Sequence, residues 1–560
     1  MDLEKEERNL ERWPRRLLYI PTLTSYEWQP GHEYNGVKEP KYNALTYTWG
    51  RWMLSENMQR DVSAIPITIH GDEWPIPRID PNHFTVEEFV NVIKAVAGIS
   101  TKFGRPRVDF IWLDIACINQ KDPHKSAAEI GRQAVIFHGA NDVCVWLTTH
   151  RELNQIVDDI WESGGLQPSD LTPYLTQSIA SLRKLLSDPW FSSLWTLQEA
   201  FLRNDAYFLS QDAQIAFRQK AHSRPDIYKL ADRCESLVRS ANRMGLDTMH
   251  DDVRSMMTKS GLGALRSKYE IDTYLAAQAR TASRREDRIY GIQQVFGLRL
   301  GNTAISTSDR ILSFTELEIE FYEALLTKYP IQSQMHVFTK HVPVEHRWRV
   351  NPCSRLLDLG SYSLPRILDD AHDDERKPKI SIRCAFSVNH SGVSSKPVVW
   401  SGVTVPLAHL KEQWDRISTT IYSNTIEPGD DDPSLLPLPL FISLDIVDEL
   451  HDAPGSGPES SELINWLAQT FPAERLHVLL LGFNCLFGSP GAQTRFEDTM
   501  YGLLILHQHD KHWARLGVCQ WRHQVNWRQK QAGLQDEDRW FLQGQGGVWE
   551  PREGILGYAG

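Results

Sequence analysis

Apolar and polar positions form short groups of different spacing over the first 210 residues of the chain. Residues 110–113 and 143–147 are continuous apolar runs that are too short for helices, whereas residues 84–97 carry apolar side chains at the spacing of one helix face. Thr85 precedes two glutamates and predicts an N-cap for that helix. Because continuous apolar strands indicate burial on both faces, the pattern predicts a parallel sheet with helices on both sides.

Three further segments extend this α/β pattern. An apolar and aromatic run at residues 44–49 predicts the first strand, and residues 127–137 have the spacing of a helix. Residues 206–209 predict another strand. The N-terminal region, residues 41–210, therefore reads as one α/β domain after a lead-in at residues 1–40.

A helix start is predicted close to the end of this domain. Asp188 and Pro189 are the residue types preferred at the N-cap and at the first helical position. In a helix that begins there, Trp195, Glu199 and Leu202 follow one another at spacings of four and three residues, so they share one face.

The pattern changes twice in the rest of the chain. Residues 226–257 and 311–326 have helical spacing, which predicts an α-rich extension at residues 211–380. Residues 381–560 predict a C-terminal region of mixed α/β structure and unknown function. Its strand-like runs lie at residues 380–386, 398–405, 439–447, 476–483 and 501–507.

Composition and charge narrow the classes of function. The 560 residues are 41% hydrophobic and 24% charged, which excludes collagen-like and largely disordered chains. The 60 Lys and Arg face 72 Asp and Glu, and a net charge of -12 repels a phosphate backbone, so we expect no nucleic-acid partner. The 19 Trp are an excess that anchors cores or lines pockets.

The cysteines favour a reducing compartment, and the apolar stretches favour a soluble protein. The seven cysteines are scattered and form no CxxC pair, which indicates neither a disulfide framework nor a cysteine-rich zinc site. Cys117 has no histidine placed to activate it, so we interpret it as a buried structural thiol. Residues 1–16 lack the apolar core of a signal peptide, and no apolar stretch is long enough for a membrane span. We expect a soluble, cytoplasmic protein.

Several common motifs are missing. The sequence has no GxxxxGK[ST], no GxGxxG after a strand and no GxSxG. His507, His509, Asp510 and His512 are a near miss for the HxHxDH motif of metallo-β-lactamase-like hydrolases, but the Asp lies one place early and only 48 residues follow. A polar loop beside Trp513 is the interpretation we favour, with a metal hydrolase as a weaker alternative, and we assign no metal ligands.

Three blocks carry most of the information, and they read YNALTYTWG at residues 42–50, IWLDIACINQ with IFHGA and VCVWL between residues 111 and 147, and PWFSSLWTLQE at residues 189–199. In this order they resemble the HET (heterokaryon incompatibility) domain of filamentous fungi, whose blocks read approximately YxALSYxWG, WIDxxCINQ with IYxxAxxVxVWLG, and WFxRxWxxQE. The resemblance is strong over residues 41–210 and weaker to residue 300. The sequence departs from the family pattern at Ser193 for Arg, at Gln133 for Met and at Phe137 for Tyr.

The resemblance implies a fold and a function. HET proteins trigger regulated cell death when genetically different hyphae fuse, and the domain resembles TIR domains, which have a flavodoxin-like parallel sheet flanked by helices. In TIR domains that cleave NAD+, the corresponding helix supplies a catalytic glutamate, so the resemblance implies that Glu199 is catalytic and that NAD+ is a substrate rather than a cofactor.

The chemistry of NAD+ cleavage suits the other residues of the blocks. The reaction passes through an oxocarbenium-like ribosyl cation, which one carboxylate can stabilise because nicotinamide leaves as a neutral molecule. Tyr47, Trp49 and Trp195 are aromatic faces on which nicotinamide or adenine can stack. Asp114 follows a central strand, where α/β sheets bind ligands, and is a candidate to orient a ribose.

Alternatives remain open for both the residues and the function. Glu199 can instead be a structural carboxylate paired with Arg203 at i+4, and Asp114 can instead cap the turn at residues 117–120. A non-catalytic adaptor that acts by homotypic assembly, or with an allelic or non-allelic incompatibility partner, is the alternative to an NAD+-hydrolysing effector that works on oligomerisation. Ser193 in place of the family arginine favours this alternative.

Overall fold

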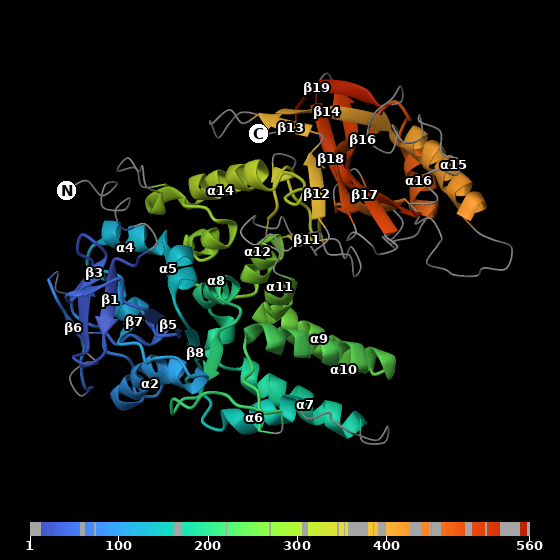
Figure 1. Ribbon diagram of the computed structural model, residues 1–560. Helices are drawn as coiled ribbons and strands as arrows, with labels where there is room; N and C mark the ends of the chain where they lie inside the picture. Colours follow the sequence, from blue (N-terminus) through green and yellow to red (C-terminus); the bar gives the residue numbers. More distant parts are fainter. Residues whose placement is uncertain are drawn as a thin grey trace. The chain divides into compact units, whose positions relative to one another are not determined.

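The computed structural model of the chain describes residues 10, 13–55, 62–71, 74–161, 171–219, 221–267, 270–304, 312–343, 346–351, 353–356, 379–384, 386–389, 399–425, 440–446, 450, 461–487, 495–509, 512–526 and 549–556 (Figure 1). The chain divides into two compact units, Met1–Phe321 and Tyr322–Gly560. The four-part division of the sequence at residues 40, 210 and 380 stays a prediction. Within the described residues, no helix is both long and apolar enough to span a membrane.

A seven-stranded sheet forms the centre of the first unit, in the order β6-β2-β1-β7-β5-β8-β9. Its four strands β7, β5, β8 and β9 are parallel to one another, whereas β1 is antiparallel to both β7 and β2. A two-stranded sheet of β3 (Glu33–Tyr34) and β4 (Val37–Lys38) lies outside it. The seven strands are β1 (Arg16–Tyr19), β2 (Thr24–Glu27), β5 (Tyr42–Thr46), β6 (Thr68–Ile69), β7 (Phe110–Trp112), β8 (Val143–Trp146) and β9 (Tyr207–Leu209).

Helices cover both faces of this sheet. Helix α2 (Val86–Gly98) lies on one side, and α4 (Pro123–Ile130) and α5 (Gln133–Gly139) lie on the other (Figure 1). Every residue of β5, β7 and β8 is buried, because both faces of these strands are covered. Thr85 and Glu88 form a capping box at the start of α2. The predicted sheet with helices on both sides is confirmed as a mostly parallel sheet, in which β1 is the antiparallel exception, and the cap at Thr85 is confirmed.

The order of the parallel strands creates a switch point. The chain passes from β5 through α2 to β7, and then returns through α4 and α5 to β8 on the other side of β5. At such a point the connections leave in opposite directions and open a crevice beyond the carboxyl ends of the strands. Residues that follow β5, β7 and β8 are therefore the ones placed to meet a ligand.

Strands β1 and β2 lie within residues 1–40 and extend the sheet on the β7 side. Two local predictions are wrong. The helix predicted at residues 127–137 is broken at Gly131 into α4 and α5. Asp188 caps only a 3₁₀ turn, η5 (Pro189–Ser192), and the helix α8 (Leu194–Leu202) begins five residues later than expected, after Ser193.

Helices make up most of the remainder of the first unit. Helix α6 packs on α7, and α9 packs on α10 and α11. The predicted helical stretch at residues 226–257 is two helices, because Gly245 adopts a left-handed conformation (φ 65°) between α9 and α10. The helices are α6 (Leu153–Trp161), α7 (Leu171–Leu186), α9 (Ile227–Arg243), α10 (Asp247–Ser260), α11 (Leu262–Ser267), α12 (Glu270–Gln278) and α13 (Asp287–Tyr290). Helix α14 (Phe314–Lys328) includes Phe321, the residue at which the first unit ends.

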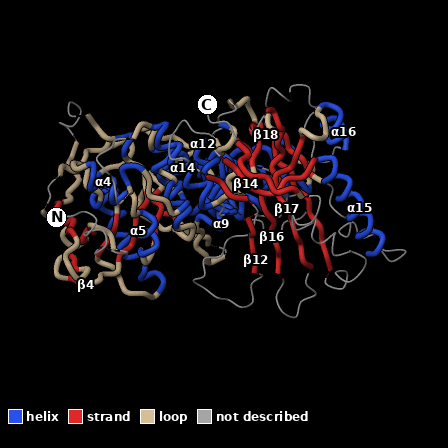
Figure 2. Tube along the Cα trace, turned by 90° about the horizontal axis from the view of Figure 1, so that it is seen from above, coloured by secondary structure: helices blue, strands red, loops and turns tan. Residues whose placement is uncertain are grey.

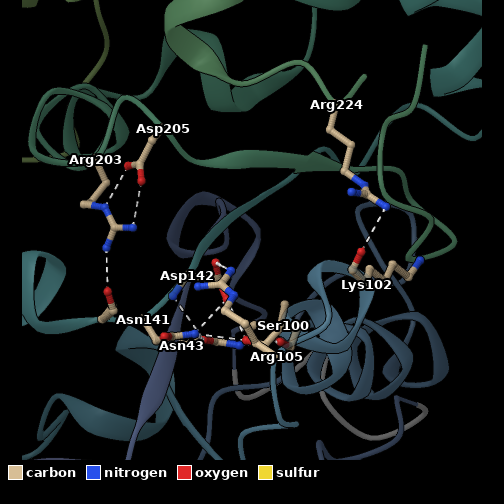
Figure 3. A network of polar contacts seen from close by, with 11 residues as sticks. Asn43, Ser100, Lys102, Arg105, Asn141, Asp142, Arg203, Asp205 and Arg224 are labelled. Atoms are coloured by element: carbon tan, nitrogen blue, oxygen red, sulfur yellow. Dashed lines mark hydrogen bonds and ion pairs between the residues drawn. The ribbon is translucent and has the colours of Figure 1, made fainter. Parts of the chain in front are cut away.

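A buried polar network fixes the amino edge of the parallel strands (Figure 3). The side-chain amide of Asn43 donates to the Val96 carbonyl at 2.7 Å, and its oxygen accepts the Asp142 backbone N–H at 3.1 Å. The Asp142 carboxylate accepts from the Ser100 hydroxyl at 2.6 Å and from the Arg105 guanidinium at 2.5 Å. These bonds tie β5 and β8 to the end of α2.

The network predicts a large loss of stability on removal of Asn43. Asn43→Ala leaves the buried Asp142 N–H without its Asn43 acceptor and removes one of two donors to the Val96 carbonyl, which keeps the Ile99 N–H, so we expect a loss of roughly 1 to 3 kcal/mol. Native-state hydrogen exchange of the β5 and β8 amides measures this loss. The exposed Asn82→Ala is the matched control and should change the free energy of opening by less than about 0.5 kcal/mol. Equal effects of the two substitutions would contradict the role given to Asn43.

The second unit contains an eight-stranded sheet with helices packed beside it (Figure 2). Strand β14 pairs with β13, β19 and β16, so strands β16, β17, β18, β19 and β14 form a closed ring of pairings. Helix α15 (Leu407–Thr425) packs on β14 and β16, and α16 (Ser461–Thr470) follows in the chain. The strands are β12 (Lys379–Cys384), β13 (Phe386–Asn389), β14 (Val399–Pro406), β15 (Phe441–Leu444), β16 (Leu476–Phe487), β17 (Arg495–His509), β18 (His512–Asn526) and β19 (Glu550–Leu556).

Strand β16 has both faces buried. Val478 and Leu480 belong to one hydrophobic cluster, and the alternating Leu479 and Leu481 belong to another. The continuous apolar run that predicted this strand is therefore explained by two cores, one on each face. The strand-like runs predicted beyond residue 381 correspond to β12, β14, β15, β16 and β17.

An ion pair and a histidine are buried together in the second unit. The Arg515 guanidinium binds the Asp445 carboxylate at 2.9 Å and the carbonyl of His336, which belongs to β10 (His336–Phe338), paired with β11 (Ser354–Leu356). The His336 side chain is completely buried. Burial, together with the positive charge of Arg515, holds the pKa of His336 well below its usual value.

This depressed pKa predicts an acid-sensitive second unit. Below pH 6.5 the unfolded chain protonates His336 while the folded chain does not, so stability falls as the pH drops. The slope attributable to His336 should approach about 1.4 kcal/mol per pH unit. Urea unfolding at several pH values measures it in the wild type and in His336→Gln, with the exposed His409→Gln as control. A slope that persists in His336→Gln would refute the assignment.

Candidate functional site

Glu199 lies in the interior of helix α8, and its side chain is only 8% exposed. The hydroxyl of Thr46, the last residue of β5, donates a hydrogen bond to Glu199 Oε2. Because β5 is the central parallel strand, this bond brings the carboxyl group of Glu199 to the carboxyl edge of the sheet.

A second hydrogen bond orients the Thr46 hydroxyl. The indole N–H of Trp190, in η5, donates to Thr46 Oγ1 at 2.8 Å. Since Thr46 Oγ1 accepts from Trp190, its own proton is directed to Glu199. Trp190 is fully buried, so the bonds from Trp190 through Thr46 to Glu199 form an ordered chain within the core.

Asp114 is the second carboxyl group of the site. It begins the short helix α3 (Asp114–Cys117), two residues after β7 ends. Its Oδ2 accepts the indole N–H of Trp49 at 2.6 Å, and its Oδ1 accepts the backbone N–H of Ile115 at 2.7 Å. Two donors therefore stabilise the charged form of this partly buried side chain.

The charges of both carboxyl groups act on the hydroxyl group of Tyr47. Its ring packs against Phe84, Phe89 and Trp146 and is 5% exposed. Burial, followed by the charge of Asp114 and a smaller contribution from Glu199, raises the pKa of Tyr47 well above 10. Its hydroxyl faces the Asp114 carboxyl group and lowers the pKa of that group through a hydrogen bond.

The two carboxyl groups have different proton affinities. Burial, with a smaller contribution from the charge of Asp114, raises the pKa of Glu199 to about 8, and the hydrogen bond from Thr46 opposes this shift. Burial also raises the pKa of Asp114, against the hydrogen bonds from Trp49 and Ile115. At neutral pH Glu199 therefore holds its proton for most of the time, whereas Asp114 has the donors that favour its anion.

The remaining residues of the predicted site are divided between two places. Trp49 belongs to the site through its bond to Asp114 and is partly buried. Trp195 lies one turn before Glu199 on α8, and its indole forms a hydrogen bond with Asp287 at the start of α13. Stacking of a ligand on Tyr47, Trp49 or Trp195 stays a prediction.

The structure does not show the structural pairing considered for Glu199. The Arg203 guanidinium binds the Asp205 carboxylate at 2.8 Å and the carbonyls of Phe137 and Ala140 at 2.9 and 2.7 Å (Figure 3). Arg203 therefore completes the end of α5 instead of neutralising Glu199. The carboxyl group of Glu199 is left with a hydroxyl as its donor, which explains why burial dominates its pKa.

The capping role considered for Asp114 is also wrong. The side chain of Asn119 accepts the backbone N–H groups of Lys121 and Asp122 at 2.8 Å and thereby caps the turn. The Asp114 carboxyl group binds Trp49 and the next backbone N–H instead.

The other candidate groups, Cys117 and His507, have surroundings that are typical of structural residues. Cys117 is buried, and burial raises the pKa of its thiol to about 12, as expected for an unreactive thiol. His507 packs on Trp513, while Asp510 lies outside the described residues. Within the part of the chain that the structure describes, no three His, Cys, Asp or Glu side chains gather to hold a metal ion.

Three residues near the carboxyl edge were not predicted from the sequence. Thr46 and Trp190 both lie inside the characteristic blocks, but the blocks do not reveal which side chain bonds to which. His83 was also missed, although it stacks on Trp52 at 3.7 Å and bonds the Thr48 carbonyl at 2.6 Å just beyond β5. Its position before a predicted helix, far from the blocks, carried no signal.

A comparison with models of protein families finds a match over the region that contains the candidate site. Residues 42–199 match the family model described as "Heterokaryon incompatibility protein (HET)". The match begins at the first residue of β5, ends at Glu199, and contains Thr46, Asp114 and Trp190. It covers less than a third of the chain. No curated protein matches the chain, and neither does any solved structure.

Proposed function

We propose that this protein is a heterokaryon-incompatibility-type effector of regulated cell death that hydrolyses the nicotinamide–ribose bond of NAD+, with Glu199 as the catalytic carboxylate. The observation that carries the proposal is the buried Glu199, held by Thr46 near Asp114 at the carboxyl edge of the sheet. The family match over residues 42–199 supports the cellular function.

The parallel strand order supports a relation to TIR domains. Strands β7, β5, β8 and β9 have the arrangement of a doubly wound sheet with its switch point at β5 and β8, and such sheets bind ligands beyond the carboxyl ends of their strands. The polar groups gathered at this edge, which are Asp114, Glu199 and the Tyr47 hydroxyl, support a polar ligand there.

In the proposed reaction the nicotinamide nitrogen leaves with the electron pair of the glycosidic bond. The positive charge passes from the pyridinium ring to the ribose, where the Glu199 carboxylate stabilises it. Water then adds to the ribosyl carbon and releases one proton, so that the products are nicotinamide, ADP-ribose and H⁺. Asp114 accepts a hydrogen bond from a ribose hydroxyl, and Trp49 and Trp195 offer aromatic faces to the rings.

The proton on Glu199 sets a condition for this reaction. A protonated carboxyl group cannot stabilise the ribosyl cation, and Glu199 has a pKa of about 8 in the unliganded site. The pyridinium ring of NAD+ carries a positive charge, and a positive charge near a buried carboxyl group favours its anion. Binding of the substrate therefore promotes ionisation of its own catalytic group.

A non-catalytic function is the second candidate. Glu199 is 8% exposed and protonated at neutral pH, and Ser193 replaces the arginine of the family pattern. These features favour a domain that acts in the cytoplasm by homotypic assembly or by binding an incompatibility partner.

Substitution of Glu199 distinguishes the two candidates. Glu199→Gln keeps the size and a hydrogen-bonding partner for Thr46 but has no negative charge, so NAD+ hydrolysis should fall at least about 100-fold. Nicotinamide release by purified, clustered protein measures the rate, with the exposed Glu152→Gln as control.

The same variants are expressed in cells that the wild type kills. If the clustered wild type leaves NAD+ intact and still kills cells, assembly is the function and hydrolysis is excluded. If both activities are lost in Glu199→Gln but not in Glu152→Gln, the catalytic function stands.

The pH dependence provides an independent prediction. Because the carboxylate is the active form, kcat/KM should rise about tenfold per pH unit below pH 8 and become constant above it. The midpoint of kcat should lie at lower pH, since the bound pyridinium favours the anion. Initial rates between about pH 6 and pH 9 test both statements. Activity that falls as the pH rises through this range would exclude Glu199 as the anionic group.

A further inference from the structure

Arg280 is a buried guanidinium group that binds the start of helix α8. It follows α12 in the chain and is 1% exposed. Its Nη1 donates to the carbonyls of Trp190 and Ser193 at 3.3 and 2.8 Å and to the Thr196 hydroxyl at 3.0 Å. Its Nη2 donates to the carbonyl of Ser260, the last residue of α10.

The charge of Arg280 is balanced by carbonyl groups. Burial is the cause that lowers its pKa to about 9, and no neighbouring carboxylate contributes to the shift. Ser260 ends α10, and Gly261 takes the left-handed conformation that terminates this helix (φ 75°). The partial negative charge at the ends of α10 and η5 therefore takes the place of an acidic partner. Such an arrangement is sensitive to geometry, because several acceptors must converge on one group.

The groups that Arg280 binds are connected by further hydrogen bonds to the candidate site. The Thr196 hydroxyl donates to the Trp190 carbonyl at 2.6 Å, so the peptide around Trp190 is held from two directions. The indole of Trp190 then holds the Thr46 hydroxyl, which donates to Glu199. A continuous series of hydrogen bonds thus leads from Arg280 to the carboxyl group of Glu199.

The segment around Arg280 holds α8 at further points. The backbone of Thr281 donates to the Ser192 carbonyl at 2.8 Å and accepts the Leu194 N–H at 3.0 Å. Asp287 binds the indole of Trp195. These contacts place residues 280–287, which lie outside the family match, against the helix that carries Glu199.

We propose that Arg280 is a positioning residue for Glu199: it fixes the peptide groups of η5 so that Trp190 keeps the Thr46 hydroxyl directed at the Glu199 carboxyl group. The inference rests on the function proposed for Glu199 and adds to it a control point outside residues 42–199. The titratable groups that face Glu199 are Asp114 and Tyr47, which Arg280 does not contact directly.

The test measures the protonation of Glu199 directly. The carboxylic acid band of Glu199 in the infrared spectrum is identified by its loss in Glu199→Gln and is followed against pH in the full-length protein. Loss of the Thr46 hydrogen bond removes a group that stabilises the anion, so Arg280→Met should raise the pKa of Glu199 by about one unit. Arg280→Lys, which reaches fewer acceptors, should raise it by a smaller amount.

If Arg280 had a purely structural role, its replacement would change the pKa of Glu199 in the opposite direction. General loosening of the core admits water to Glu199 and lowers its pKa, because burial is what raises it. Trp190→Phe keeps the ring, removes the indole N–H and should reproduce the rise. The exposed Arg239→Met is the matched control and should leave the pKa unchanged.

The outcomes separate the inference from the proposed function. A pKa of Glu199 that falls or stays constant in folded Arg280→Lys or Arg280→Met, with circular dichroism equal to the wild type, overturns the positioning role. If Arg280→Met does not fold, the result for Arg280→Lys decides. If the Arg280 variants raise the pKa of Glu199 but the wild-type protein does not hydrolyse NAD+, the positioning role of Arg280 is retained and the catalytic role of Glu199 is excluded.

Discussion

The burial of one carboxyl group against one hydroxyl group is the constraint on which the candidate site depends. Glu199 lies in a helix interior with Thr46 as its donor, while Arg203 turns away from it to Asp205 and to the end of α5. A buried carboxyl group with so little compensation keeps its proton at neutral pH. Asp114, Tyr47 and Trp190 each acquire their importance from their relation to this group.

The fold of the first unit could be predicted where its strands are buried on both faces, because such strands appear in the sequence as continuous apolar runs. Residues 110–113 and 143–147 are continuous apolar runs, and these became the parallel strands β7 and β8. Strand β1 escaped prediction because it is a short strand in a charged N-terminal segment, and its place in the sheet depends on pairing with β7, more than 90 residues away. Local pattern does not encode such a distant partner.

The site was predictable as a set of residues but not as a set of contacts. Asp114 and Trp49 were selected from separate blocks, and the structure joins them by a hydrogen bond. The i+4 spacing of Glu199 and Arg203 suggested a pair that the structure does not form, since α8 ends at Leu202 and Arg203 leaves the helical conformation to bind the Ala140 carbonyl. Arg280 could not be selected, because a cation balanced by carbonyl groups leaves no acidic residue in the sequence to mark it.

The two edges of the central sheet differ in how completely their polar groups are satisfied. At the amino edge, Asn43 and Asp142 have donors and acceptors for their buried atoms, so this edge has nothing to gain from a bound molecule. At the carboxyl edge, the buried carboxyl group of Glu199 has the Thr46 hydroxyl as a donor, and burial still disfavours its anion. Folding leaves this unfavourable term in place, and a cationic ligand that stabilises the anion recovers it as binding affinity.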